Sequence, residues 1–175
     1  MNYNDLSEKA QIEMVTNDSR RLKYIDDSTN AVTANERRWH ALLYIENPSE
    51  AVQLAAVREN GVDIRFINCP SEAVQLAAVQ EEGYSIKFIK NPSEAVQLVA
   101  VKRSAKSIRH INTPTEEVQI LAVQERGGLI RYIKNPSEAV QLAAVQIDPW
   151  VIDYINNPSD ELRTYADLIK LGKSQ

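Results

Sequence analysis

The chain has 175 residues, a length that suits one domain of ordinary size. Hydrophobic residues make up 43% of it and charged residues 25%, which is typical of a folded globular protein and not of a disordered one. A net charge of −4 gives no general attraction to nucleic acid or to an anionic membrane. No apolar run approaches the roughly 18 residues of a spanning helix, and the first residues lack the features of a signal peptide. We therefore expect a cytoplasmic protein that has no membrane contact.

Prolines at a fixed interval divide the chain into repeats. Six of them are each separated from the next by 22 residues: Pro48, Pro70, Pro92, Pro114, Pro136 and Pro158. Each belongs to a version of the string Asn-Pro-Ser-Glu-Ala-Val-Gln-Leu-Ala-Ala-Val. Self-similarity at a period of about 20 to 50 residues is the signature of a solenoid or a repeat array.

The first half of each repeat has the pattern of an α-helix. In the repeat 47–68 we expect Asn47 as the N-cap, Pro48 at the first helical position and Glu50 three residues after the cap. Gly61 stands where a glycine would end the helix, which predicts a helix of about 11 to 13 residues. In the next repeat Cys69 occupies the cap position, where it would be a poor substitute for asparagine.

The second half of each repeat is short, and its pattern leaves two alternatives open. In the segment 62–67, Ile64 and Phe66 alternate around Arg65 as they would in a strand, while Ile64 and Ile67 share a face in a helix. We favour a second short helix, because the leucine-rich signature of strand-forming repeats is missing. The alternative is an α/β solenoid with short parallel strands.

These patterns predict an all-α fold, an α-solenoid of about eight 22-residue helix–turn–short-helix repeats that forms a single repeat domain over residues 1–175. Residues 1–46 contain two divergent repeats, the first of which aligns Ser7 with Ser49. Residues 47–156 contain five regular repeats. Residues 157–175 supply a C-terminal capping helix that we expect to end at Gly172. One repeat alone cannot bury its apolar surface, so we expect neighbouring repeats to stack.

Residues at the same position of successive repeats line up in a solenoid, and we call each such set a column. Binding residues are therefore expected to form a column. Glutamines form one column, which is either an amide ladder between neighbouring helices, a solvated stripe or a polar recognition strip: Gln11, Gln53, Gln75, Gln97, Gln119 and Gln141. Acidic residues form another, at the predicted third helical position, where capping and the helix dipole explain them: Glu50, Glu72, Glu94, Glu116, Glu138 and Asp160.

A third column pairs cations with aromatic rings in the second half of the repeat. The candidate partner-binding residues are Arg65, Lys87, Arg109 and Arg131, followed by Phe66, Phe88, His110 and Tyr132. Such residues can clamp single-stranded nucleic acid by stacking and phosphate pairing, or they can bind an acidic protein surface. In the structural alternative the rings fill the space between repeats and the cations extend along them into solvent.

Catalytic, cofactor-binding and metal-binding residues are not predicted. His40 and His110 are far apart in the sequence, and neither has a second metal ligand nearby. Cys69 is the only cysteine, which excludes an internal disulfide. There is no glycine-rich phosphate loop and no nucleophile elbow.

The string Asn-Pro-Ser-Glu-Ala-Val-Gln-Leu-Ala-Ala-Val, followed by Gly-x-x-Ile-Arg-Phe-Ile, resembles a group of short helical repeats in phage and bacterial proteins of unknown function. The resemblance is close over residues 47–171 and loose over residues 5–46. It implies an all-helical repeat fold and a phage origin, which would place the protein in the host cytoplasm. Small phage proteins of this size often bind host proteins, so it also implies a host protein as the partner.

The absence of a reaction site and the columns together predict a non-enzymatic protein–protein interaction module that binds through an extended solenoid surface. Single-stranded nucleic-acid binding through the cation–aromatic column is the alternative function. Self-association through the ends of the solenoid also stays open, because an uncapped end favours packing against a second copy.

Overall fold

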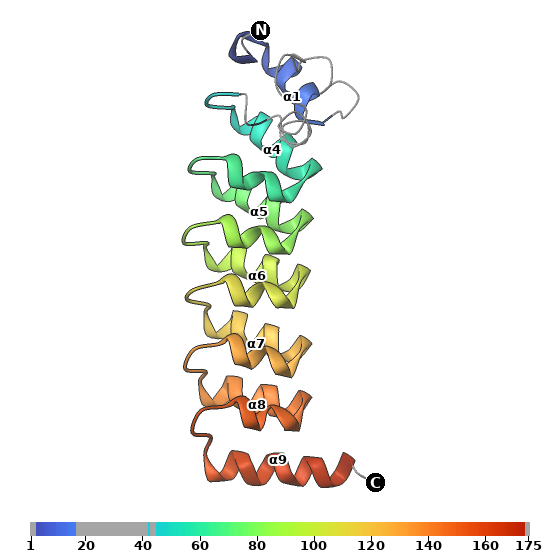
Figure 1. Ribbon diagram of the computed structural model, residues 1–175, viewed down its shortest axis with the longest axis vertical. Helices are drawn as coiled ribbons and strands as arrows, with labels where there is room; N and C mark the ends of the chain where they lie inside the picture. The colour runs from blue at the N-terminus through green and yellow to red at the C-terminus, as the bar shows by residue number, and fades with distance from the viewer. Residues whose placement is uncertain (1–2, 17–41, 43–44, 174–175) are drawn as a thin grey trace, which may run out of the picture. The chain divides into compact units, whose positions relative to one another are not determined.

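The computed structural model describes residues 3–16, 42 and 45–173, and every regular element in this part of the chain is a helix (Figure 1). The prediction of an all-α repeat fold is therefore confirmed. The second half of each regular repeat is a 3₁₀-helix of six residues, so the alternative with short parallel strands is wrong. Most of the two divergent repeats predicted within residues 1–46 lies outside the described residues.

Each regular repeat consists of one α-helix followed by one 3₁₀-helix. The α-helices are α1 (Glu8–Thr16), α4 (Glu50–Glu59), α5 (Glu72–Glu81), α6 (Glu94–Arg103), α7 (Glu116–Glu125), α8 (Glu138–Ile147) and α9 (Asp160–Lys173). The 3₁₀-helices are η1 (Tyr3–Asp5), η4 (Gly61–Phe66), η5 (Gly83–Phe88), η6 (Ala105–His110), η7 (Gly127–Tyr132) and η8 (Pro149–Tyr154). The regular α-helices have 10 residues, fewer than the 11 to 13 predicted.

The chain divides into two compact units, residues 1–90 and 91–175, and the boundary falls between two repeats. In the first unit α1 packs against α4, α4 against α5, and η4 against η5. In the second unit α6, α7, α8 and α9 pack in chain order, and η6, η7 and η8 form a second row. The prediction of one domain over residues 1–175 is not tested by this division and stays a prediction.

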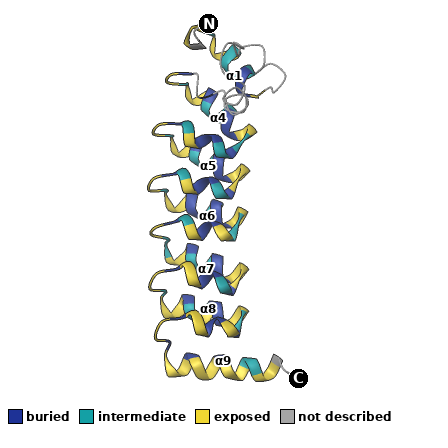
Figure 2. Cartoon of the chain, viewed as in Figure 1, coloured by how far each residue is buried: buried dark blue, intermediate teal, exposed yellow. Residues whose placement is uncertain are grey.

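The core of each unit is made of the same few positions in every repeat. In the repeat 47–68 these are Val52, Ala56, Val57 and Ile64, and their equivalents in the following four repeats are also buried. Figure 2 shows the buried residues on the turns of α5 to α8 and the exposed residues on their loops. Full burial of one such valine or isoleucine side chain contributes about 1.5–3 kcal/mol. Contact between neighbouring repeats is thus the main source of stability.

The helix start was predicted at the wrong residue. Ser49, and not Asn47, is the N-cap of α4: its Oγ accepts a hydrogen bond from the amide of Val52, and the helix begins at Glu50. Asn47 has a φ of 49°, in the left-handed region that asparagine tolerates better than most residues. The same conformation recurs at Cys69, Asn91, Asn135 and Asn157, so Cys69 is not a helix cap either.

The glycines that follow α4, α5 and α7 have a different role from the predicted helix stop. Gly61 has no positive φ and begins η4, while Asn60 ends α4 in an extended conformation. A Cβ atom on Gly61 would lie 2.4 Å from the carbonyl oxygen of Ala78 in the next repeat. A Cβ atom on Gly127 would lie 2.7 Å from the carbonyl oxygen of Ala144. Glycine suits these two positions because two backbones approach closely, although Ala105 and Pro149 occupy the equivalent position in η6 and η8. Gly172, the other predicted stop, lies inside α9.

The acidic column links neighbouring repeats. Glu50 is the first residue of α4, not the third, and its carboxylate accepts a hydrogen bond from the hydroxyl of Ser71 in the next repeat. The same bond joins Ser49 to Glu8 and Ser137 to Glu116. The predicted roles in capping and in the helix dipole are therefore incomplete.

The glutamine column binds within its own repeat. Gln53 donates from Nε2 to the carbonyl oxygen of Pro48 at 2.8 Å, and Gln141 donates to that of Pro136 at 3.0 Å. Gln11 makes the equivalent bond to Leu6, at 3.4 Å, which supports the predicted alignment of the first repeat. The predicted alternative of an amide ladder between neighbouring helices is not seen in these bonds.

We expect Gly61→Ala and Gly127→Ala each to lower the free energy of unfolding, because the added methyl group would force the neighbouring backbone away at a cost of about 1–3 kcal/mol. Urea denaturation followed by circular dichroism measures this. Gly172→Ala is the control: nothing lies within 4 Å of its added Cβ atom, and alanine should stabilise α9 by roughly 0.5–1 kcal/mol. Equal effects of all three substitutions would contradict the close-approach explanation.

Ser107 is fully buried in η6, and its hydroxyl has no hydrogen-bond partner among the described residues. The equivalent residues of the next two repeats are Leu129 and Val151, which are buried and apolar. We expect Ser107→Ala to raise the free energy of unfolding by about 1 kcal/mol, since an unpaired buried hydroxyl costs about 1–3 kcal/mol. Ser93→Ala, which removes an N-cap bond to Val96, should lower it. A loss of stability in Ser107→Ala would show that the hydroxyl is paired.

Candidate functional site

The eight candidate partner-binding residues all lie at the ends of 3₁₀-helices. Arg65 and Phe66 end η4, and Lys87 and Phe88 end η5, in the first compact unit. The second unit holds the other two pairs, Arg109 with His110 at the end of η6 and Arg131 with Tyr132 at the end of η7. The four cations are exposed, and the rings range from half-buried to exposed.

Several of these cations lie over aromatic rings. The Arg65 guanidinium is 4.4 Å from the centre of the Phe66 ring, and Lys87 Nζ is 4.5 Å from that of Phe88. Arg131 lies 4.4 Å from the ring of Tyr154 in the next repeat. Such contacts are worth about 0.5–1 kcal/mol at exposed sites. They match the structural alternative, in which the cations pack along the rings.

Arg109 and Arg131 also line a groove in the second unit that contains further cations. This basic groove has a volume of about 370 Å³ and is lined by Lys106, Arg109, Arg126, Gly128, Leu129, Arg131, Tyr132 and Asp148. Three of the eight predicted residues, Arg109, Arg131 and Tyr132, are brought together here. The others do not line the groove: His110 is next to Arg109 in η6, and the remaining four belong to the first unit.

The charges of the basic groove are unbalanced, with four cations against one carboxylate. The side chains of Lys106 and Arg126 have no hydrogen-bond or ion-pair partner in the described part of the chain. Arg131 donates from Nε to the carbonyl oxygen of Gly128 at 2.9 Å. The carboxylate of Asp148 accepts from the amide of Trp150 at 3.0 Å, as the cap of η8. A local excess of positive charge in a chain of net charge −4 attracts anionic groups to this groove.

Lys106 and Arg126 were missed by the column analysis because neither charge recurs along the chain. Arg126 takes the cap position before η7, where Asn60, Glu82 and Asp148 in other repeats accept a hydrogen bond from the 3₁₀-helix. η7 has no side-chain cap bond. A comparison of columns for single changes of charge would have found both residues. Arg126 therefore leaves η7 without a side-chain cap, as Ser104 leaves η6, and it adds an unpaired cation to the basic groove.

The polar side chains of the basic groove are mainly hydrogen-bond donors. They are cations, one phenol and one capping carboxylate, and no nucleophile is paired with a general base. Within residues 3–16, 42 and 45–173, no group of three or more His, Cys, Asp or Glu side chains is placed to hold a metal ion. Guanidinium groups bind carboxylates and phosphates through paired hydrogen bonds, so the groove suits an anionic ligand.

No protein-family model matches the chain, and no similar protein is found among curated sequences or among solved structures. The resemblance to phage and bacterial repeats is thus not tested and stays an expectation. In the described part of the chain no helix is both long enough and apolar enough to cross a membrane.

We expect Arg126→Asn to raise the free energy of unfolding by roughly 0.5–2 kcal/mol, because asparagine at this position can cap η7 as Asn60 caps η4. Thermal unfolding measures the change. Arg126→Ala is the matched control, since it removes the same charge without adding a cap, and its stability should stay near that of the wild type. If both variants were less stable than the wild type, Arg126 would be a structural residue.

Proposed function

We propose that this chain is a non-enzymatic protein-binding module that holds an acidic segment of a partner protein in the basic groove. The observation that carries the proposal is the set of four cations around one groove, two of which have no partner in the described part of the chain. Arginine forks pair with carboxylates in two parallel hydrogen bonds. Electrostatic steering toward such a groove would also raise the association rate of an acidic partner.

An acidic protein segment fits the site better than single-stranded nucleic acid does. Proteins that bind single strands stack bases on open aromatic faces and carry a positive groove along the backbone. Here Arg65, Lys87 and Arg131 already lie over rings, which limits stacking by bases. The net charge of −4 would repel a long polyanion, whereas a short acidic segment meets mainly the basic groove.

A host protein is the partner that we expect. This part of the proposal rests on the resemblance to phage repeats and would place the complex in the host cytoplasm.

The proposal is tested with a fluorescently labelled ten-residue peptide of alternating glutamate and serine, whose binding to the full chain is followed by anisotropy. We expect Lys106→Glu combined with Arg126→Glu to weaken binding by at least about tenfold, because attraction becomes repulsion at the site. Arg58→Glu combined with Lys102→Glu is the matched control. It makes the same change of net charge on two exposed side chains outside the basic groove, and it should weaken binding far less.

A labelled oligothymidine with the same number of charges separates the two functions. Tighter binding of this strand than of the peptide, lost in Lys106→Glu combined with Arg126→Glu and strongly reduced by salt, would replace the proposal with nucleic-acid binding. Equal losses of peptide binding in the groove variant and in its control would show that the peptide responds only to net charge, and the proposed site would be wrong.

A further inference from the structure

The junction between α8 and α9, like that between α6 and α7, lacks the bond from a cap hydroxyl to a glutamate that joins other α-helices. At the preceding junction Ser137 donates its hydroxyl to Glu116, and in the first unit Ser71 donates to Glu50. Ser159, the N-cap of α9, accepts from the amide of Leu162 at 3.2 Å but makes no bond to Glu138. The carboxylate of Glu138 is consequently left without a partner among the described residues.

The same junction is also more open. Leu142 is 41% exposed, while its equivalents Leu54, Leu76, Leu98 and Ile120 are half-buried. The apolar pattern of the repeat is also interrupted in α9, where Thr164 and Asp167 stand at the positions of Leu142 and Val145 of α8. Figure 2 accordingly shows α9 exposed over most of its length.

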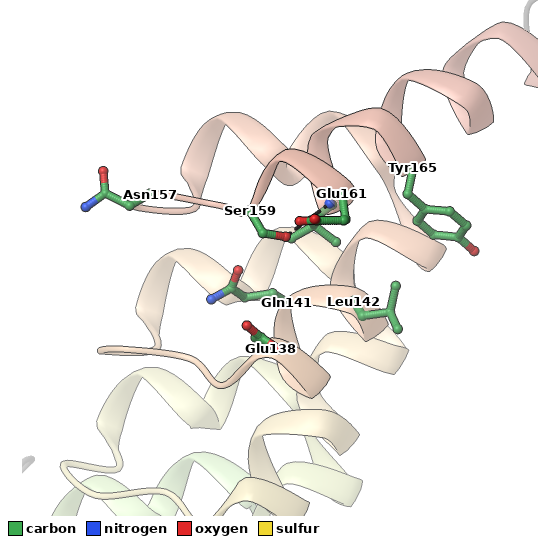
Figure 3. Close-up of a pocket in the computed structure, with 8 residues that line it drawn as sticks. Glu138, Gln141, Leu142, Asn157, Ser159, Glu161 and Tyr165 are labelled. Carbon is green, nitrogen blue, oxygen red and sulfur yellow. Dashed lines mark hydrogen bonds between the residues drawn. The ribbon is translucent and has the colours of Figure 1, made fainter.

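A groove of about 490 Å³ lies at this junction, and we call it the terminal groove. Figure 3 shows Leu142 of α8 and Tyr165 of α9 at one end of it. Glu138 lies on the α8 side, and Glu161 lies next to Ser159 on the α9 side. The terminal groove thus combines an apolar end with two carboxylates from different helices.

The charged groups of the terminal groove are both acceptors, whereas its donors are neutral groups, the hydroxyls of Ser159 and Tyr165 and the amide of Asn157. Glu138 and Glu161 have no partner in the described part of the chain. The amide nitrogen of Gln141 is occupied by the carbonyl oxygen of Pro136, and Figure 3 shows its oxygen nearer to α9 than its nitrogen. Gln97 occupies the equivalent position in α6, and its Oε1 atom is buried and also has no hydrogen-bond partner among the described residues. No cationic side chain lines the groove.

We propose that the terminal groove binds an arginine side chain presented by a partner protein. A guanidinium group carries five donors in one plane, which matches two carboxylates and an amide oxygen, and its aliphatic stem can pack on Leu142 and Tyr165. Lysine offers three donors on a point charge and matches this set less well. The site is separate from the basic groove and takes a ligand of opposite charge.

The test uses three short peptides, acetyl-Gly-X-Gly-amide with arginine, lysine or citrulline at X, titrated into the isotope-labelled full chain and followed by NMR. Citrulline keeps the shape of arginine but is neutral. We expect the arginine peptide to bind most tightly, the lysine peptide less tightly and the citrulline peptide at least about tenfold more weakly than arginine, since charge-assisted bonds are about twice as strong as neutral ones. Chemical shift changes should centre on α8 and α9.

Glu138→Gln combined with Glu161→Gln should reduce the affinity for arginine to that for citrulline. Glu117→Gln combined with Glu125→Gln, which changes two exposed glutamates of α7 outside the groove, is the matched control and should bind as the wild type does. If the groove variant unfolds, Gln141→Lys provides the second test, because it keeps a donor for Pro136 and removes the acceptor while adding a positive charge.

Equal affinities for arginine and citrulline, or an equal loss in the control variant, would overturn the inference. A wild-type dimer in sedimentation that dissociates in the groove variant would also overturn it, because the arginine would then come from a second copy. Lys106→Glu combined with Arg126→Glu should leave arginine binding intact, so that failure here and failure of the proposed function are distinguishable.

Discussion

Burial of one apolar stripe between neighbouring repeats is the constraint on which the rest of the structure depends. Val52, Ala56, Val57 and Ile64 are shielded from water only because the adjacent repeats cover them. This requirement explains the small alanines, which let helices approach, and the glycines that begin η4 and η7, where a Cβ atom would collide with a carbonyl oxygen. The terminal groove lies at the junction with α9, the helix that departs from this apolar pattern.

The fold could be predicted from the sequence because its period is regular and each repeat has the same apolar positions. The residues that start and end each helix could not be predicted, since similar residue patterns occur in different backbone conformations. Asparagine before proline suggested a helix cap, although its function is to occupy the left-handed region two residues before the true cap at Ser49. Glycine suggested a helix stop with positive φ. Its actual role is to let the backbone of the next repeat come close, and this contact between repeats cannot be read from the sequence of one repeat.

The candidate site was predictable only in part, for a related reason. Columns reveal what repeats share, and they correctly placed Arg109 and Arg131 at equivalent positions of η6 and η7. The charge excess of the basic groove depends on Lys106 and Arg126, which break the pattern. In a repeat protein the shared residues mainly build the scaffold, and the exceptions to the repeat distinguish one place on it from another.

All three of these hydrogen bonds between α-helices run the same way, from the serine hydroxyl that caps one helix to the first glutamate of the helix packed before it. Each such serine also accepts from its own helix, so one hydroxyl group starts a helix and attaches it to its neighbour. Any run of repeats joined in this manner has chemical polarity, with an unused donor at one extremity and an unused acceptor at the other. Its two extremities therefore cannot be interchanged, and a new repeat could join the run in a single orientation only.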